Sequence, residues 1–176
     1  MTIRELLVMR HAKSSWDRPE DSDFERRLNQ RGVEDGAKMA RIYAAELPRP
    51  ERVLCSTARR TRDTLAFLIP DLIDPRVVEY HDSLYLAAAT TWLNWIQAAP
   101  STCQVLMLMG HNPGLTDLVN QLLAGAAPSL DNLPTLGAAH FRSRSKWSNW
   151  GEAPAEVTAI LRPKQFPNTE SHSHDG

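Results

Sequence analysis

The sequence predicts an α/β domain, a three-layer α/β/α sandwich with a mostly parallel central sheet. Short apolar runs alternate with stretches of helical periodicity, and no internal repeat or linker divides the chain. Strands that alternate with helices are joined by crossovers, which place parallel strands in one sheet with helices on both faces. The 176 residues fit one such domain. We therefore expect a single domain over 1–166, followed by a polar, disordered tail over 167–176.

Six short runs of apolar and β-branched residues predict the strands. The first covers 6–9, and the run over 104–109 is the most apolar in the chain. Runs of this length that are apolar throughout are typical of strands buried on both faces. The other strands are expected over 52–55, 77–80, 138–141 and 157–161.

Four segments have the spacing of an amphipathic helix. Between 28 and 47, apolar and small residues recur at intervals of four and three, and prolines end the pattern. Similar patterns predict helices over 58–68, 90–99 and 115–124. The polar stretch 13–27 is expected to be a long surface loop, and such loops are uncommon enough to suggest a function.

The composition excludes several classes of protein. With 42% hydrophobic and 23% charged residues, the chain has a globular balance, which excludes a disordered chain or a coiled coil. A net charge of −1 disfavours nucleic-acid binding. Cys55 and Cys103 are too few for a disulfide scaffold, and no apolar run approaches the ~18 residues of a membrane span. We expect a cytoplasmic monomer that binds neither nucleic acid nor membrane.

Charged and titratable residues follow the predicted strands. Each alone is commonly a structural or solvated side chain. Carboxyl ends of parallel strands, however, meet at one edge of the sheet, where α/β proteins bind their ligands. We therefore expect convergence of the residues that follow the first four strands, which are Arg10, His11, Arg60, Asp82 and His111.

Phosphoryl handling is the chemistry that this set fits. Guanidinium groups bind phosphoryl oxygens bidentately, and a histidine can attack phosphorus and carry it covalently. Arginines and a second histidine can stabilise the charge on the equatorial oxygens during transfer. The sequence has no metal-ligand spacing such as His-Glu-x-x-His. We expect neither a metal nor another cofactor.

Several motifs, in order, resemble the histidine phosphatase (phosphoglycerate-mutase-like) superfamily. Its usual opening Arg-His-Gly is Arg-His-Ala here, and the run Arg-His-Ala-Lys-Ser-Ser-Trp over 10–16 resembles the SixA-type phosphohistidine phosphatases more closely. Further matches are the R-x-L-N-x-R-G segment near 27–32, S-P-x-x-R-A-x-x-T over 56–64, the second histidine motif over 110–115 and a P-T element at 133–135. The resemblance covers roughly 3–162 and implies a phosphoglycerate-mutase-like fold.

The resemblance implies a role for each matching residue. His11 is the nucleophile that becomes phosphorylated, and Arg10 and Arg60 bind the phosphoryl oxygens. His111 forms a hydrogen bond with a phosphoryl oxygen and completes the pocket. Arg60 is chosen over the neighbouring arginines because it lies four residues after Ser56.

Three further residues are candidates for the site. Superfamily members that cleave phosphate esters usually have a carboxylic acid after the third strand, and Asp82 is the nearest candidate; a capping or loop aspartate is the alternative. Ser14 matches a serine of the first motif and is a candidate substrate contact. Lys13 is another candidate contact, because it could offset the charge of Asp17, or it is a solvated loop charge.

The substrate predicted by these features is a phosphohistidine. An imidazole leaving group has a pKa of about 6.5 and departs without the acid that an alkoxide needs. The segment between Arg60 and His111 leaves no room for a capping subdomain, which suits a protein side chain. We expect a metal-independent phosphatase acting on a protein such as a histidine phosphotransfer domain, in phosphorelay signal transduction. The alternatives are a small-molecule phosphomonoesterase and a non-catalytic phosphate- or phosphoprotein-binding module.

Overall fold

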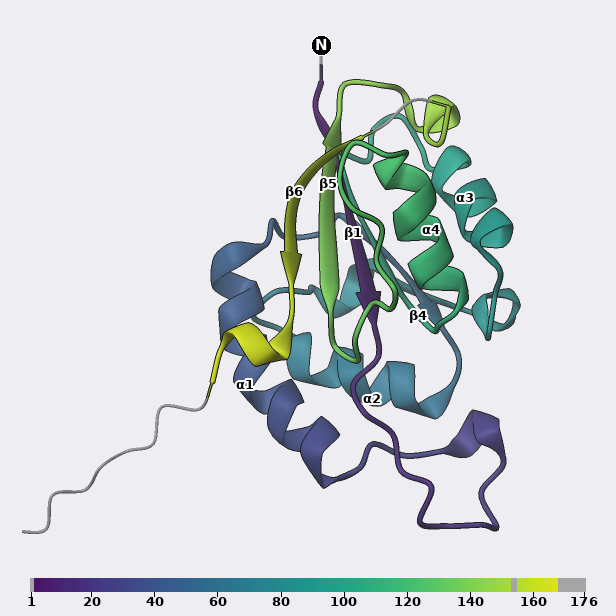
Figure 1. Ribbon diagram of the computed structural model, residues 1–176, viewed down its shortest axis with the longest axis vertical. Coiled ribbons are helices and arrows are strands. Elements are labelled where there is room, and N and C mark those ends of the chain that lie inside the picture. Colours follow the sequence, from purple (N-terminus) through teal and green to yellow (C-terminus); the bar gives the residue numbers. More distant parts are fainter. Residues whose placement is uncertain (1, 153–154, 168–176) are drawn as a thin grey trace, which may run out of the picture.

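Three layers make up the computed structural model, which describes residues 2–152 and 155–167 (Figure 1). A six-stranded sheet in the order β3-β2-β4-β1-β5-β6 forms the middle layer. The four strands β1 to β4 are parallel to one another, and β5 is antiparallel to both of its neighbours. The α/β sandwich and its mostly parallel sheet are confirmed. The strands are β1 (Arg4–Arg10), β2 (Arg52–Ser56), β3 (Val78–His81), β4 (Val105–Gly110), β5 (Ala138–Ser143) and β6 (Glu156–Leu161).

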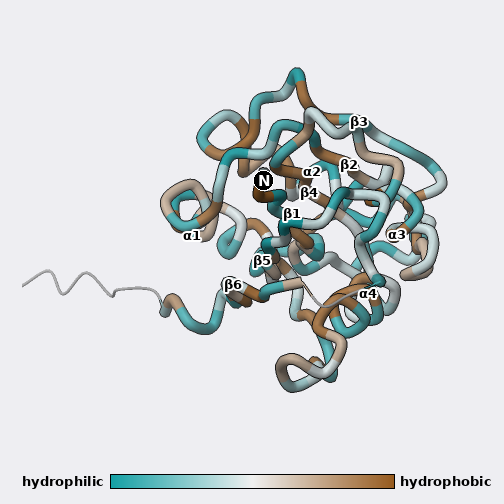
Figure 2. Tube along the Cα trace, turned by 90° about the horizontal axis from the view of Figure 1, so that it is seen from above, coloured by the Kyte–Doolittle hydropathy of each residue, from teal (hydrophilic) through white to brown (hydrophobic). Residues whose placement is uncertain are grey.

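Two pairs of helices cover the two faces of the sheet (Figure 2). One face carries α1 (Gln30–Glu46) and α2 (Arg59–Leu68), and the other carries α3 (Ala89–Gln97) and α4 (Gly114–Leu123). All four helices lie within a few residues of their predicted ranges. Their periodicity is a reliable guide because each helix buries one apolar face against the sheet.

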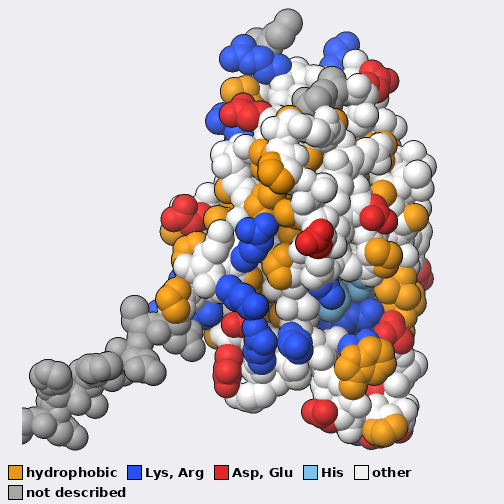
Figure 3. Space-filling view, viewed as in Figure 1, with side chains coloured by type: hydrophobic (Ala, Val, Ile, Leu, Met, Phe, Trp, Pro, Cys, Tyr) orange, Lys and Arg blue, Asp and Glu red, His pale blue; other side chains and the backbone are white. Residues whose placement is uncertain are grey.

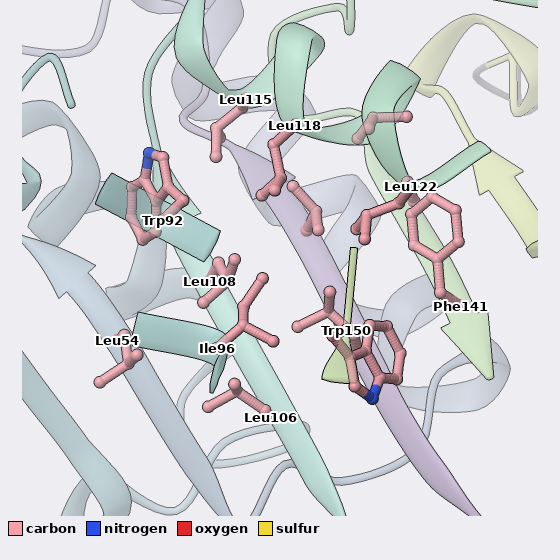
Figure 4. Packing of buried hydrophobic residues seen from close by; sticks show 14 of the residues in the cluster. Leu54, Trp92, Ile96, Leu106, Leu108, Leu115, Leu118, Leu122, Phe141 and Trp150 are labelled. Carbon is pink, nitrogen blue, oxygen red and sulfur yellow. The ribbon is translucent and has the colours of Figure 1, made fainter. Parts of the chain in front are cut away.

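Alternation along the strands divides the core into two clusters. In β1, Leu6 and Val8 pack with α3 and α4, whereas Leu7 and Met9 pack with α1 and α2. Successive side chains of a strand point to opposite faces, so an uninterrupted apolar run serves both layers. Figure 4 shows the first cluster, in which Trp92 and Ile96 of α3 lie against Leu108 and its neighbours on the sheet.

The long loop between β1 and α1 folds back on itself. The amide of Ser15 donates to the carbonyl of Arg27 at 2.8 Å, and the amide of Asn29 donates to the carbonyl of Lys13 at 3.0 Å. Asn29 also caps α1 through its side chain, which accepts from the amide of Gly32 at 2.8 Å. A Cβ at Gly32 would lie 2.1 Å from the Lys13 carbonyl oxygen, so this close approach requires glycine. The loop is therefore fastened to the start of α1.

No capping subdomain interrupts the fold between α2 and β4. That segment, described throughout, contains β3, α3 and the short 3-10 turns η2 (Pro75–Val77) and η3 (Asp82–Leu84). The predicted tail lies outside the described residues from 168 onward. Among the helices that the structure describes, none is both long and apolar enough to cross a bilayer.

Gly114→Ala is expected to lower the free energy of unfolding by about 2 kcal/mol, as overpacking against backbone does. A Cβ at Gly114 would lie 1.9 Å from the carbonyl oxygen of Ala87, which cannot rotate away. Gly36→Ala is the matched control, since its Cβ would meet only the movable ring of Phe67, at 2.6 Å. Urea denaturation should show a smaller change for the control. Equal losses in both variants would contradict the backbone clash.

Candidate active site

The residues that follow β1 and β4 lie side by side at the carboxyl edge of the sheet. Arg10 is paired with Gly110, so His11 and His111 come next on neighbouring strands. The amide of His11 donates to the carbonyl of Gly110 at 3.1 Å and continues the ladder by one residue. The two imidazole centroids are 5.2 Å apart.

His11 is buried, and its two ring nitrogens have different partners. Nδ1 lies 2.6 Å from the carbonyl oxygen of Ala12, which can only accept, so Nδ1 carries the proton. Nε2 is therefore unprotonated, and its lone pair accepts from Nε of Arg60 at 3.3 Å. Burial, together with the charges of Arg60 and Arg10, lowers the pKa of His11 to about 3. The ring is neutral near pH 7, and its lone pair is that of a nucleophile.

His111 is buried beside it and has one nitrogen without a partner. Nε2 lies 2.8 Å from Oγ of Ser56, which also accepts from the amide of Ala58 at 3.3 Å. The Ser56 hydroxyl has no other acceptor among the described residues, so it donates to Nε2 and the ring proton lies on Nδ1. Nδ1 has no hydrogen-bond partner among the described residues. Burial and the neighbouring His11 and Arg60 lower the pKa of His111 to about 2, so this ring is neutral as well.

Arg60 reaches the histidines from the first turn of α2 and is only 3% exposed. Besides Nε, which donates to His11, both terminal nitrogens are bound. Nη1 donates to the backbone carbonyl of Asp23 at 2.5 Å, and Nη2 donates to the Asp23 carboxylate at 3.2 Å. Because hydrogen bonds hold all three nitrogens, the guanidinium has a single orientation, and its plane is fixed beside His11.

Arg10 enters from the end of β1. Its Nη1 donates to the carbonyl of Leu133 at 3.0 Å and to Oδ1 of Asn132 at 3.4 Å. Its Nε is buried and has no partner within the described chain. Arg10 Nε and His111 Nδ1 are thus two buried N–H donors without an acceptor among the described residues. A buried donor without an acceptor destabilises the fold, so a ligand that supplies one is favoured there. In Figure 3, histidine side chains are visible among those of Lys and Arg on this face.

Asp23 is a site residue that sequence reasoning missed. It lies in the 3-10 turn η1 (Asp23–Glu25) of the long loop, and its carboxylate accepts from Arg60, Arg26 and the hydroxyl of Tyr85. Partial burial opposes ionisation, but the hydrogen bonds from Tyr85, Arg26 and Arg60 outweigh it and lower the pKa of Asp23 to about 2. Its charge also acts on His111. The ring of Tyr85 stands edge-on to His111, with centroids 5.6 Å apart.

Arg26 is a third arginine near the histidines, and its charge contributes to the lowered pKa of His11. It donates to the Asp23 carboxylate at 2.9 Å and to the carbonyl of Ser15 at 3.0 Å. Its guanidinium lies over the ring of Trp16, 3.4 Å from the centroid. The long polar loop itself indicated a functional segment. Its sequence does not reveal that Asp23 and Arg26, among its many charges, face the site.

The remaining predicted site residues have other surroundings. Asp82 begins η3, and its carboxylate accepts from Oγ1 of Thr57 at 2.6 Å. Within the described residues, no hydrogen bond joins Asp82 to His11, His111 or Arg60. Ser14 accepts a hydrogen bond from Arg26. Lys13 is exposed, and its backbone holds the start of α1.

The two neutral histidines make stability depend on pH. A histidine in the unfolded chain has a pKa of about 6.5, above the values of about 3 and about 2 in the fold. The unfolded state therefore binds more protons below pH 6.5, and the free energy of unfolding falls as the pH falls. Between pH 7 and 5 we expect a loss on the order of 2 kcal/mol per histidine, measured by urea denaturation. His111→Asn should lose less over that interval than the wild type. An equal loss of stability in the variant and the wild type would contradict the lowered pKa of His111.

Known proteins resemble this chain in sequence and in structure. No model of a known protein family matches the chain. An uncharacterised protein of Mycobacterium leprae (strain TN) is 31% identical over 166 residues, which is 89% of this chain and 100% of the relative. A crystal structure named as a candidate phosphohistidine phosphatase SixA from Agrobacterium tumefaciens is 30% identical, covers 91% of this chain and 98% of its own, and has a TM-score of 0.75. A structure of the same name from Nakamurella multipartitia is 25% identical, covers 93% and 98%, and has a TM-score of 0.77.

The fold and these similarities define a phosphatase, a hydrolase of the histidine phosphatase (phosphoglycerate-mutase-like) superfamily. Within that superfamily, the chain belongs to the SixA-type family, as its sequence motifs predict.

Proposed function

We propose that this protein is a phosphohistidine phosphatase that removes the phosphoryl group from a histidine of another protein through a phospho-His11 intermediate. One observation carries the proposal: a neutral histidine, whose Nε2 lone pair accepts only a 3.3 Å hydrogen bond from Arg60, lies beside the buried N–H donors of Arg10 and His111, which have no partner among the described residues. A phosphoryl group supplies the oxygens that these donors lack, and it supplies the electrophile for the lone pair.

In the first step, Nε2 of His11 forms a bond to phosphorus, and the bond from phosphorus to the substrate imidazole breaks. The substrate reacts as a protonated phosphoimidazole and leaves as neutral histidine. His11 keeps its Nδ1 proton, which the Ala12 carbonyl holds, and becomes a phosphoimidazolium. Arg10, Arg60 and His111 stabilise the equatorial oxygens during this transfer.

In the second step, water attacks phosphorus and the bond to Nε2 breaks. The electron pair returns to Nε2, which restores the neutral ring, and the proton of water passes to solvent with the released phosphate. The Nδ1 proton makes the imidazole a good leaving group in this step too. Both steps use groups of this chain and water, with no metal or other cofactor.

The leaving group explains why no carboxylic acid is required. Asp82 is bonded to Thr57, and Asp23 is ionised at neutral pH because its pKa is about 2. In the described structure neither carboxyl group donates a hydrogen bond toward His11 or His111. An alkoxide would need one, whereas an imidazole with a pKa of about 6.5 does not. These surroundings favour a phosphohistidine over a sugar phosphate or a nucleotide.

The test compares a histidine-phosphorylated phosphotransfer domain with sugar phosphates and nucleotides at equal concentration. We expect kcat/KM for the phosphohistidine protein to be at least about 10²-fold higher, the usual scale of a missing acid catalyst. Asp82→Asn should leave turnover of the phosphohistidine protein unchanged. Faster turnover of phosphate esters, dependent on Asp82, would instead favour a small-molecule phosphomonoesterase. Tight phosphate binding without turnover would favour a binding module.

A further inference from the structure

A pocket outside the histidine pair includes Asn132, a hydrogen-bond partner of Arg10, in its lining. Its volume is about 240 Å³, and it is lined by the end of the α4–β5 connection, the start of α1 and the segment after β6, including the 3-10 turn η5 (Pro163–Gln165). The lining residues are Arg31, Asp35, Asn132, Pro134, Thr135, Arg162, Pro163 and Lys164. Pro134 and Thr135 belong to the sequence motif at 133–135, of which the catalytic site uses only the Leu133 carbonyl, the acceptor of Arg10.

The lining of this pocket carries an excess of positive charge. The lining holds three cationic side chains, Arg31, Arg162 and Lys164, and one carboxylate, Asp35. Asp35 is already shared, since it lies 3.7 Å from Arg31 and 3.5 Å from Lys38. Within the described chain, neither Arg162 nor Lys164 forms an ion pair. Figure 3 shows Lys and Arg side chains gathered on this face and extending toward the histidines.

Asn132 connects the pocket to the catalytic group. Its Oδ1 accepts from Nη1 of Arg10 at 3.4 Å and from the side-chain amide of Asn112 at 2.6 Å. Arg10 in turn directly precedes His11. Asn132 thus lies in the wall of the pocket and also contacts the arginine next to His11.

Size and charge together point to one kind of occupant. Sites for small molecules usually enclose about 300 to 1,000 Å³, whereas this pocket has room for one or two side chains. The chain as a whole has a net charge of −1 and offers no general attraction to an acidic partner. We propose that this pocket binds an acidic side chain, Asp or Glu, that lies near the phosphohistidine on the substrate protein. This inference rests on the proposed function and adds a specificity site to it.

The probes are two synthetic peptides that carry one phosphohistidine each. In the first, Asp and Glu flank the phosphohistidine; in the second, Asn and Gln replace them. We expect KM for the acidic peptide to be about tenfold lower, with similar kcat, because two or three partly exposed charge pairs contribute on that scale. The advantage should shrink as salt is raised.

The variant Arg162→Glu/Lys164→Glu should remove the preference for the acidic peptide. Its matched control is Arg144→Glu/Lys146→Glu, with the same charge change in the connection after β5, at the other end of the sheet. Lys164 is exposed, so Lys164→Glu alone keeps the test valid if the double variant fails to fold. Turnover of phosphoramidate, which has no flanking residues, monitors the catalytic groups separately.

Three outcomes separate the inferences. Loss of the preference in the pocket variants alone, with phosphoramidate turnover kept, supports the pocket. Equal KM values for the two peptides in the wild type, or an equal loss in the control variant, overturn the pocket and leave the proposed function standing. If the wild type hydrolyses neither peptide nor phosphoramidate, the proposed function fails and the pocket inference fails with it.

Discussion

His11→Ala is expected to abolish both the phosphoenzyme and turnover, with a fall in kcat on the order of 10³-fold or more. Nε2 of His11 carries the lone pair that lies beside Arg60, and Nδ1 donates its proton in a hydrogen bond to the Ala12 carbonyl. Alanine supplies no nucleophile, and water would have to attack the substrate directly. The measurement is rapid-quench trapping of the labelled protein, in which phosphohistidine is recognised by its lability in acid and its stability in base.

Two observations would oppose this expectation. Equal phosphate release by the wild type and His11→Ala would show that His11 is not on the reaction path. Acid-labile label that persists in His11→Ala would place the phosphoryl group on another residue. Far-ultraviolet circular dichroism of the variant is the control for folding, because His11 is buried.

Arg60→Lys is expected to lower kcat/KM about 10²-fold or more, a loss typical of removing one transition-state donor. The guanidinium forms its hydrogen bonds through all three nitrogens, to His11 and to two oxygens of Asp23. A lysine keeps the charge but cannot form the same fork, and it cannot remain oriented by two partners at once. Steady-state kinetics with the phosphohistidine protein provides the measurement.

Arg59→Lys is the matched control for this substitution. Arg59 is the preceding residue of α2, and its guanidinium pairs with Asp63 at 3.6 Å on the surface. Its kcat/KM should remain within about twofold of the wild type, as expected for an exposed ion pair. A similar loss in both variants would mean that the effect comes from α2 as a whole and not from the fork of Arg60.

Features of the site that follow from the backbone topology can be predicted from the sequence. Parallel strands place the residues after them at one edge, so His11 and His111 could be expected near each other from the apolar runs before them. The stretch 6–9 of β1 is apolar at every position because helices cover both faces of the sheet, and such a stretch itself indicates a central strand. The neighbour relation of β1 and β4 is less accessible, since strand order depends on packing between distant segments.

The limits of sequence reasoning appear in the loop between β1 and α1. Asp23 and Arg26 are two of many charges there, and only the folded loop shows that they bond to each other and that Asp23 reaches Arg60. Asp82 illustrates the reverse case. Its backbone lies where an acid is expected, after β3, but the hydroxyl of Thr57 binds its carboxylate. Side-chain partners of this kind depend on distances that the order of residues does not specify.

The pairing of β1 with β4 affects the order in which the two parts of the site unfold. The spacing of His11 and His111 is set by the two central strands, so the pair can separate only when those strands part, which is a global unfolding event. The loop that carries Asp23 is held by fewer contacts than the central strands, chiefly its hydrogen bonds to Arg60, Tyr85 and the start of α1, and it can open locally at a lower free energy. Amide hydrogen exchange should therefore be slow at His11 and fast through the loop. The histidine pair would then persist until the whole fold opens, whereas the contacts of Asp23 would break and re-form with each local opening of the loop.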